Sequence, residues 1–367
     1  MKNIVCGLLL LISTTIHAQQ VSDILKKTYP TEIAPGIIVA LRKDSVNQFF
    51  KKGFANLNEG RYIHEDTQFR LASVSKQFTS MAIYQLIRKG LLDFETPVRE
   101  ILTELPASTA NVQILHLLQH SSGIMDYESY ISNNQLDQVS DKDVLSILAQ
   151  QDSVYFEAGS TFRYSNSGYC LLALIVERIS QQSFSSFCKE QLFDKSDLEH
   201  AVVYKPTDTI HERAYGYHPD NTTFIFADQS LTSATQGDGG VYMSISAYSS
   251  WADAHQILFD AQYLADLKNQ KILVKDNIYY SLGWFLGYDE ANNLYLFHSG
   301  ESTGFHNIVL FNHTQNNALV AFSNRDDHEI GELFKKIGES NSFSFTTIGL
   351  HNLFQWLSNV YANRISE

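Results

Sequence analysis

Apolar and polar positions divide the chain into strand-like ends and a helix-rich middle. The β-branched run from Gly36 to Leu41 follows Pro35, and Gln48 to Phe54 predicts a partner strand beyond a polar turn. From Val74 to Lys89, apolar residues recur on most sides of a predicted helix, so this helix is expected to be buried. Gly90 is expected to end it.

Helical patterns dominate from Leu91 to about Ala265, and Asp141 is expected to cap one of these helices. The clearest helical segments are 141–150, 169–179, 183–193 and 246–259. Strand patterns return after Ile278, over 279–288, 294–297, 306–311 and 318–323. Two predicted helices close the chain, over 329–336 and 346–362.

Strands at both ends and helices between them predict a mixed α/β (α+β) fold. Its centre is one antiparallel sheet built from both termini, flanked by helices, with an inserted helical subdomain. The expected catalytic domain spans 19–340, with a sheet part over 19–90 and 266–340 and a helical part over 91–265. Residues 341–367 are expected to form a C-terminal helical extension.

The first residues have the pattern of a secretory signal. Lys2 precedes the apolar run from Ile4 to Ile12, and polar residues follow it up to Ala18. That run is too short to cross a membrane as a helix. We expect residues 1–18 to be a signal peptide that is cleaved after Ala18, which predicts a secreted or periplasmic protein. The alternative is that this segment is retained as an amphipathic anchor.

Composition excludes several classes of protein. Only 18% of the 367 residues are charged and 44% are hydrophobic, which excludes a disordered chain or a coiled coil. The net charge of −13 argues against nucleic-acid or anionic-membrane partners. Small molecules or peptides are the expected substrates, and no transmembrane segment is expected after cleavage.

Two cysteines remain after the expected cleavage, Cys170 and Cys188. Export would allow them to form a disulfide, whereas their apolar surroundings are typical of buried thiols. The sequence leaves this choice open. Histidines at zinc-ligand spacing do not accompany them, and nothing in the sequence requires a metal or an organic cofactor.

A candidate nucleophile lies at the start of the buried helix. Ser73-Val74-Ser75-Lys76 places a lysine three residues after a serine, on the same helical face. A desolvated lysine amine can accept the serine proton, and the helix N-terminus favours developing negative charge. The motif alone is weak, because Ser186 and Lys189 have the same spacing.

Two further short motifs occur more than once. The Tyr-x-Asn pattern occurs at Tyr164–Asn166 and again at Tyr361–Asn363. A cation followed by x-Gly occurs at His298–Gly300, Lys51–Gly53 and Lys336–Gly338.

In the order S-x-x-K, Y-x-N, then K/H-x-G on a strand, the set resembles the penicillin-recognising serine hydrolases. These include class C β-lactamases, D-alanyl-D-alanine carboxypeptidases and related esterases. Only Ser73, Tyr164 and His298 satisfy both order and context, since Lys336 lies in a predicted helix and Tyr361 near the C-terminus. The similarity also covers 66–76, 115–124, 238–244 and 298–305, and extends over about 35–323.

The resemblance implies a serine β-lactamase-like fold and an acyl-enzyme mechanism. Ser73 is the implied nucleophile, and Lys76 and Tyr164 form the implied base system. Two cationic or proton-rich neighbours are expected to keep the Tyr164 side chain more acidic than a free phenol. Asn166 is expected to orient Lys76 and a substrate amide.

The strand motif supplies the rest of the implied site. His298 is its catalytic histidine, and Gly300 is expected to let the strand approach the substrate closely. The backbone N–H groups of Ser73 and Glu301 form the implied oxyanion hole. His120 is expected to be a structural residue below the site, hydrogen-bonded there.

A histidine stands where family β-lactamases usually have a lysine, and Glu301 adds an acid beside it. We therefore expect penicillins and free D-alanine carboxylates to be poor substrates, and neutral esters or substrates with a free amino group to be favoured. The loop from Asp126 to Tyr130 is expected to border the cleft. The alternatives are a D-alanyl-D-alanine carboxypeptidase or β-lactamase, and a non-catalytic binding protein. The last helix is expected to pack on the sheet.

Overall fold

A computed structural model describes residues 19–43, 46–253, 258–343 and 352–364. The expected signal segment, 1–18, lies outside the described residues. So do 254–257 and 346–351, which belong to two of the predicted helices.

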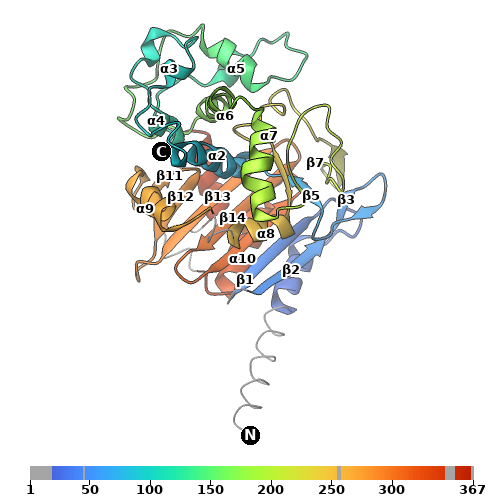
Figure 1. Ribbon diagram of the computed structural model, residues 1–367. Coiled ribbons are helices and arrows are strands. Elements are labelled where there is room, and N and C mark those ends of the chain that lie inside the picture. Colours follow the sequence, from blue (N-terminus) through green and yellow to red (C-terminus); the bar gives the residue numbers. More distant parts are fainter. Residues whose placement is uncertain (1–18, 44–45, 254–257, 344–351, 365–367) are drawn as a thin grey trace.

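An antiparallel sheet of eight strands forms the centre of the molecule, and strands from both chain ends meet in it (Figure 1). β1 pairs with β15 from Ile37 opposite Ser323 to Arg42 opposite Ala318, which confirms the predicted sheet. In spatial order the strands are β10 (Ile272–Lys275), β11 (Ile278–Ser281), β12 (Trp284–Tyr288), β13 (Leu294–Ser302), β14 (Phe305–Asn312), β15 (Asn317–Ser323), β1 (Ile37–Lys43) and β2 (Val46–Lys52).

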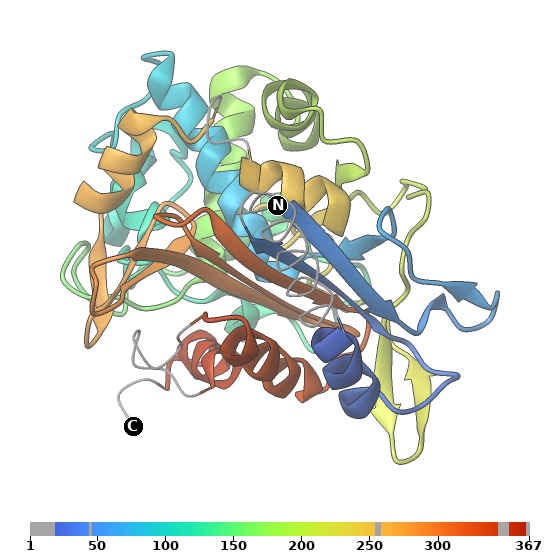
Figure 2. The same cartoon turned by 90° about the horizontal axis from the view of Figure 1, so that it is seen from below.

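Helices cover both faces of this sheet, which explains why β1 and β14 are buried at nearly every position. Figure 2 shows two C-terminal helices and a helix over 19–28 on one face, and α2 and α8 on the other. The two C-terminal helices are α10 (Glu329–Ser340) and α11 (Leu353–Tyr361). The buried side chains of α11 include Leu353, Leu357 and Val360, and α11 lies against β13, as predicted for the last helix.

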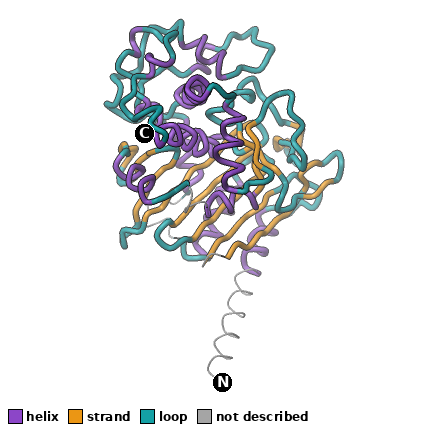
Figure 3. The backbone as a smooth tube through the Cα atoms, in the orientation of Figure 1, coloured by secondary structure: helices purple, strands orange, loops and turns teal. Residues whose placement is uncertain are grey.

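The other helices lie on the same side of the sheet as α2 and α8 (Figure 3). α6 lies at their centre and contacts α2, α4, α5 and α7. The helices are α2 (Lys76–Arg88), α3 (Val98–Ile101), α4 (Ile114–Leu118), α5 (Asp141–Leu148), α6 (Asn166–Ser180), α7 (Phe184–Cys188), α8 (Ile245–Asp253) and α9 (Ala261–Asn269). Short 3-10 turns are η1 (Ala72–Ser75), η2 (Ala107–Thr109), η3 (Tyr127–Tyr130) and η5 (Asp194–Ser196), and η4 (Lys189–Phe193) is a π-turn.

The chain also contains short strands, between residues 54 and 244, that the sequence pattern does not predict. A three-stranded sheet has the order β5 (Gln68–Arg70), β9 (Val241–Ser244) and β6 (Ala201–Val203). Two hairpins pair β3 (Phe54–Asn56) with β4 (Arg61–Tyr62) and β7 (Tyr217–Asp220) with β8 (Thr223–Phe226). These strands are too short to show a period of two in the sequence.

The predicted cap of α5 is wrong by one residue. Ser140 is the N-cap, its hydroxyl accepts the backbone N–H of Asp143, and the Asp143 carboxylate accepts the backbone N–H of Ser140 in return. Asp141 is the first helical residue instead, and its carboxylate turns inward to the backbone N–H groups of Gln236 and Gly237. This inward turn ties α5 to the segment that precedes β9.

Cys170 and Cys188 are both buried free thiols, which settles the choice that the sequence leaves open. Among the described residues, no helix combines the length and the apolar character that a membrane crossing requires.

Candidate active site

The candidate nucleophile lies in a tight turn between β5 and α2. Ser73 belongs to η1, and Lys76 is the first residue of α2. Ala72 has a φ of 49°, a left-handed conformation that costs a side-chain-bearing residue about 1 kcal/mol. Ser73 is only partly buried, whereas the Ser75 side chain is fully buried and accepts the Val241 backbone N–H. The turn therefore presents Ser73 and holds Ser75 in the core.

Lys76 is fully buried, and its Nζ makes three polar contacts. They are with Ser73 Oγ at 3.0 Å, Asn166 Oδ1 at 2.9 Å and the Asp238 carbonyl oxygen at 2.8 Å. A neutral amine can donate its two N–H groups to Asn166 Oδ1 and the Asp238 carbonyl oxygen, which can only accept. Its lone pair is then left for the serine hydroxyl. Burial lowers the pKa of Lys76 to about 8. The site therefore favours an amine that can take the serine proton.

The second serine–lysine pair with this spacing has a different environment. Ser186 and Lys189 are exposed at α7 and η4, and the Lys189 ammonium pairs with Asp194 at 2.7 Å. This lysine lacks the burial that surrounds Lys76, and its polar partner is a carboxylate rather than a serine hydroxyl. Sequence spacing is the same in both pairs, and burial separates them.

Tyr164 lies beside Lys76, with the Lys76 Nζ 4.9 Å from the centre of its ring. The predicted acidification of this phenol is wrong, because burial raises the pKa of Tyr164 well above its ordinary value. Ser73 is close enough to lower that pKa slightly, although the two hydroxyls make no hydrogen bond of ordinary geometry. Tyr164 is therefore a protonated phenol in this state, suited to donate a proton.

The His120 ring packs 4.3 Å from that of Tyr164, and its Nδ1 accepts the Ser165 backbone N–H at 3.1 Å. This confirms the expected structural role of His120.

Asn166, the first residue of α6, connects Lys76 to an acid from the helical part. Its Oδ1 accepts from Lys76, and its Nδ2 donates to Glu128 Oε1 at 2.8 Å. Glu128 belongs to η3, so the loop from Asp126 to Tyr130 does border the site, as predicted. The Glu128 side chain has exposed area, but protein atoms surround most of its carboxyl, and this desolvation raises the pKa to about 6.

Gly300 allows β13 to lie directly on the nucleophile turn. A Cβ on Gly300 would lie 2.1 Å from the Leu71 carbonyl oxygen and 3.1 Å from the Ser73 backbone nitrogen. The predicted close approach is therefore to the turn that carries Ser73. Only glycine permits this distance, and the contact brings β13 against η1, with Glu301 as the next residue of the strand.

His298 lies below the site and is fully buried. Its Nδ1 is 2.6 Å from the Ser299 carbonyl oxygen, which can only accept, so Nδ1 carries the proton. Burial, with a contribution from the Lys76 charge, lowers the pKa of His298 to about 3. The ring is therefore neutral, as the sequence argument expects, and its centre is 6.3 Å from the Tyr164 ring.

One cavity opens above these residues, and three predicted site residues line it: Ser73, Asn166 and Glu301. Lys76, Tyr164, His298 and Gly300 are not among its lining residues and lie behind its wall. Other residues of the lining are Arg70, Ala72, Tyr127, Glu128, Ser230, Thr232, Ser233, Thr235, Asp238, Gly239, Ser302 and Thr303. Three acidic residues and one arginine are thus among the lining residues.

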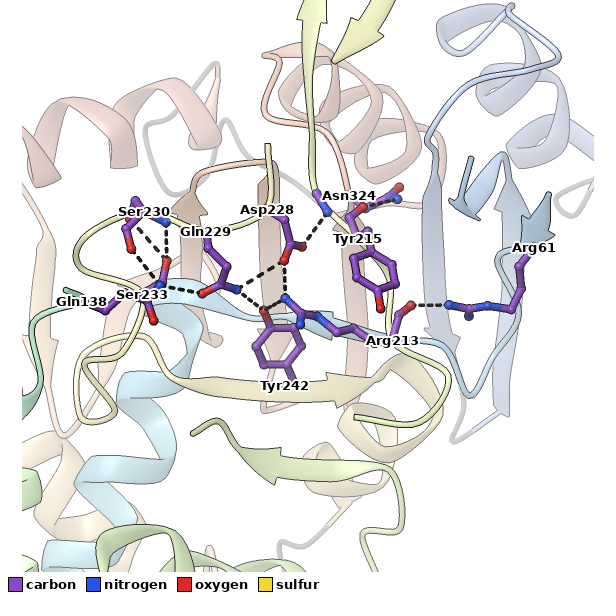
Figure 4. Close-up of polar contacts among 11 residues, drawn as sticks. Arg61, Gln138, Arg213, Tyr215, Asp228, Gln229, Ser230, Ser233, Tyr242 and Asn324 are labelled. Carbon is purple, nitrogen blue, oxygen red and sulfur yellow. Dashed lines mark hydrogen bonds and ion pairs between the residues drawn. The ribbon is translucent and has the colours of Figure 1, made fainter. Parts of the chain in front are cut away.

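Polar contacts hold the loop that forms one wall of the cavity (Figure 4). The Arg213 guanidinium donates to the Asp228 carboxylate and to the Tyr242 hydroxyl, the latter at 2.9 Å. Gln229 donates to the same hydroxyl at 3.0 Å. Since Tyr242 belongs to β9, these contacts fix the start of the loop that continues to Ser230.

Sequence reasoning did not assign four residues that the structure brings to this site: Arg70, Glu128, Asp238 and Tyr361. Arg70 lies in the similar segment 66–76, three residues before Ser73, and Glu128 lies in the loop that was expected to border the cleft. Asp238 begins the similar segment 238–244, and its carbonyl oxygen accepts a hydrogen bond from Lys76. Tyr361 belongs to the repeated Tyr-x-Asn motif that its place near the C-terminus excluded, yet its ring lies 4.5 Å from that of Tyr164.

A buried group of potential metal ligands adjoins the site. The ligand atoms of Asp141, Cys170 and Asp238 lie within 4.8 Å of one another. Burial raises the pKa of the Cys170 thiol well above its ordinary value and that of Asp141 to about 7. Metal binding requires such groups to lose their protons, and the raised pKa values disfavour that loss.

Comparison with known proteins places this geometry in context. The beta-lactamase family model matches residues 25–335. A penicillin-binding protein of Bacillus subtilis is 28% identical over 80% of this chain and 68% of its own length. A beta-lactamase of Yersinia enterocolitica is 30% identical over 56% of this chain and 53% of its own length.

A solved structure also shares the fold. The D-amino acid amidase of Ochrobactrum anthropi, complexed with D-phenylalanine, has a TM-score of 0.75 and 19% identity. The match covers 89% of this chain and 99% of that one.

Proposed function

We propose a function for this chain within the beta-lactamase family, to which it belongs: an exported serine hydrolase that cleaves an ester or amide through an acyl-enzyme on Ser73. The family consists of serine hydrolases that include amidases and peptidases. The observation that carries the proposal is the buried Lys76, whose Nζ lies 3.0 Å from Ser73 Oγ and whose other contacts are acceptors.

In the first step, Ser73 Oγ forms a bond to the carbonyl carbon of the substrate as its proton passes to the neutral amine of Lys76. The carbonyl electron pair moves to oxygen, where the backbone N–H groups of Ser73 and Glu301 stabilise it. When the tetrahedral intermediate collapses, the bond to the leaving group breaks. Tyr164, a protonated phenol, can donate to that group and recover its proton from Lys76.

Water then adds to the acyl carbon and loses a proton to the same base system. The bond to Ser73 Oγ breaks, Ser73 regains its proton and the acid product leaves. This chemistry needs only side chains and backbone groups that surround the cavity and its wall.

The charges of the cavity support a preference for substrates without a carboxylate. Glu128, Asp238 and Glu301 line it with Arg70, so acids outnumber cations among the lining residues. His298 is neutral and lies behind the wall, where family β-lactamases usually have a lysine. We propose neutral esters, or amides with a free amino group near Glu128, as the preferred substrates. The solved amidase with this fold is compatible with an amine-bearing class.

Two alternative functions can be distinguished from this one by experiment. The names of the curated relatives favour a penicillin-binding carboxypeptidase or a β-lactamase. A binding protein that is acylated without turnover would have the same motifs and a slow deacylation step.

A substrate panel separates these functions. It comprises p-nitrophenyl acetate, D-phenylalanine p-nitroanilide, a peptide that ends in D-alanyl-D-alanine, and benzylpenicillin. We expect turnover of the first two by the wild type and the Ser186→Ala control, and none by Ser73→Ala. Preferred turnover of the peptide or of benzylpenicillin would contradict the proposed substrate class, and a stable adduct without turnover would favour the binding protein.

A further inference from the structure

The C-terminal helix reaches the candidate active site, although sequence analysis treats it as an extension of the catalytic domain. α11 begins after Asn352, whose side chain caps it by accepting the Gln355 backbone N–H at 3.0 Å. Its apolar side packs on the sheet, and Trp356 lies 5.8 Å from Phe285 of β12. The last residue of the helix is Tyr361, which is therefore held by a packed element rather than by a loose terminus.

Tyr361 meets β13 where that strand loses a neighbour. The pairing of β12 with β13 reaches Phe297 opposite Phe285, while β13 continues beside β14 to Ser302. Among the strands of the described residues, none pairs with this edge of β13 from His298 onward. Backbone groups on such an edge need other partners if they are buried.

The Tyr361 hydroxyl supplies those partners at Ser299. It accepts the Ser299 backbone N–H at 3.0 Å and the Ser299 Oγ–H at 2.9 Å, and it donates to the Ser299 carbonyl oxygen at 2.9 Å. Along a strand, the N–H and C=O groups of alternate residues point to the same side. The next backbone groups on this edge are therefore those of Glu301, whose N–H belongs to the proposed oxyanion hole.

The same side chain also contacts the residues below and behind Ser73. Its hydroxyl lies 3.1 Å from His298 Nδ1, and the two rings stack with centres 5.7 Å apart and an angle of 20°. On its other side, its ring lies 4.5 Å from that of Tyr164. One tyrosine thus touches the histidine of the strand motif and the proposed proton donor together.

Two more contacts from the end of the chain reach site residues. Ser358 Oγ donates to Glu301 Oε1 at 2.7 Å, and Asn363 Nδ2 donates to the Tyr164 carbonyl oxygen at 3.4 Å. The helix and the residues that follow it therefore contact Tyr164, His298 and Glu301. Packing of an apolar helix face on a sheet does not require any of these polar contacts.

We propose that Tyr361 is a positioning residue of this active site, which fixes the free edge of β13 and the His298 ring relative to Tyr164. This role rests on the proposed acyl-enzyme mechanism. Tyr361 does not need to touch the substrate. It acts through the placement of the Glu301 backbone N–H and of the Tyr164 phenol, and a displacement of about 1 Å in such groups costs roughly 100-fold in rate.

The test compares Tyr361→Phe, which removes only the hydroxyl, with the wild type and with Tyr84→Phe as a matched control. Tyr84 is a buried tyrosine of α2, whose hydroxyl donates to Asp266 at 2.6 Å. In Tyr361→Phe we expect the acylation rate constant for p-nitrophenyl acetate to fall at least ~10-fold. The KM for that ester should change by less than about 3-fold, since uniform binding is untouched. The melting temperature should fall no further than in Tyr84→Phe.

A spectroscopic readout is independent of turnover. In ¹⁵N-resolved NMR spectra of the histidine side chains, His298 of the wild type should be a neutral ring with its proton on Nδ1 from pH 8 down to about pH 5, since burial lowers its pKa to about 3. Tyr361→Phe should shift the His298 ring resonances, and Tyr84→Phe should not. Ser299→Ala, which removes one partner of the hydroxyl, should reduce acylation in the same direction and by less, and it replaces Tyr361→Phe if that variant does not fold.

Equal acylation rates in the wild type and Tyr361→Phe would overturn the positioning role and leave the proposed function intact. So would a rate loss explained by an equal loss in Tyr84→Phe. A wild-type protein that no ester or fluorophosphonate acylates would overturn the proposed function, and this inference with it.

Discussion

At the scale of single residues, burial rather than spacing determines which lysine can act as a base. Lys76 is fully buried among two carbonyl-type acceptors and a serine hydroxyl, whereas Lys189 is exposed and paired with Asp194. Desolvation disfavours the charged ammonium only in the first case. The rate of acylation should therefore report the titration of Lys76.

We predict that kcat/KM for p-nitrophenyl acetate rises about 10-fold per pH unit up to a midpoint near pH 8, the pKa of the buried amine, and levels off above it. The sign follows because only the deprotonated amine accepts the serine proton. Lys76→Arg should lower the rate at least ~100-fold and abolish the rise, since a guanidinium keeps its proton. A profile that stays flat from pH 6 to 9 in the wild type would contradict the assignment, and Lys189→Arg is the matched control.

A second prediction at this scale concerns Glu128 and amine-bearing substrates. The pKa of this carboxyl is about 6, so it is ionised at neutral pH. Glu128→Gln keeps an oxygen for Asn166 Nδ2 and removes the charge. We expect KM for D-phenylalanine p-nitroanilide to rise about 10-fold, as for a lost charged hydrogen bond, with a much smaller change for p-nitrophenyl acetate.

The wild type provides an internal check of the same point. Its KM for the anilide should rise as the pH falls through about 6, because protonation removes the negative charge, and Glu128→Gln should lack this dependence. Equal effects of the substitution on both substrates would show that Glu128 acts on Asn166 rather than on a substrate amine.

At the scale of elements, the site depends on the contact between β13 and η1. Gly300 carries that contact, since a side chain there would collide with the Leu71 carbonyl oxygen. The strand and the need for a glycine at this position can be predicted from the sequence. The partner in the contact is visible only in the structure, because it is the nucleophile's own turn.

Gly300→Ala should separate β13 from η1. We expect a stability loss of about 1–3 kcal/mol, typical of overpacking, and a loss of acylation of roughly 100-fold from the displaced backbone donor. Gly168→Ala in α6 is the control. Its Cβ would lie 3.6 Å from Leu117, an ordinary contact, and alanine should stabilise the helix by up to ~1 kcal/mol. Thermal unfolding and p-nitrophenyl acetate acylation measure both effects, and an active Gly300→Ala enzyme would contradict the role of the contact.

The elements also show which parts of the fold are readable from sequence. The strand pair at 36–54, the buried α2 and the strands after 278 follow from apolar periodicity over long runs. β5, β6 and β9 have three or four residues each, and their partners are far away in the sequence. Local patterns carry no information about such pairing.

In the candidate site, too, local motifs could be predicted from the sequence and long-range contacts could not. Ser73, Lys76, Tyr164 and Asn166 stand in motifs with fixed spacing, and their mutual contacts agree with the roles that the resemblance implies. The pKa of Tyr164 could not be predicted, because it depends on the burial of the phenol among residues from other elements. Tyr361 carried a visible motif, and only the three-dimensional path of the chain end shows that it returns to the site.

At the scale of the whole molecule, buried acids connect the helical part to the wall of the cavity. The Asp141 carboxyl lies beside Asp238 and Cys170, and burial with the charge of Asp238 raises its pKa to about 7. A carboxyl with a raised pKa in the folded state binds more protons folded than unfolded. Stability from this group is full below about pH 4 and is lost as the pH rises toward 7.

We predict that Asp141→Asn reduces this loss. Relative to the wild type, the variant should become more stable as the pH rises from 4 to 8, its free energy of unfolding increasing by an amount on the order of a few kcal/mol. The difference between the two proteins isolates Asp141, because groups such as His298 titrate in both. Urea unfolding at several pH values measures it, with the exposed Asp137→Asn as the control. A constant difference across this range would contradict the raised pKa of this carboxyl.

Whether Ser73 is the residue that forms the acyl-enzyme can be tested directly. The protein is treated with a fluorophosphonate and examined by intact-protein mass spectrometry and peptide mapping. Trypsin cleavage after Arg70 and Lys76 isolates the peptide 71–76, in which Ser75 is the only other serine. We predict a single adduct on this peptide that is present in the wild type and Ser186→Ala and absent in Ser73→Ala. An adduct of equal yield in Ser73→Ala, or no adduct in the folded wild type, would contradict it.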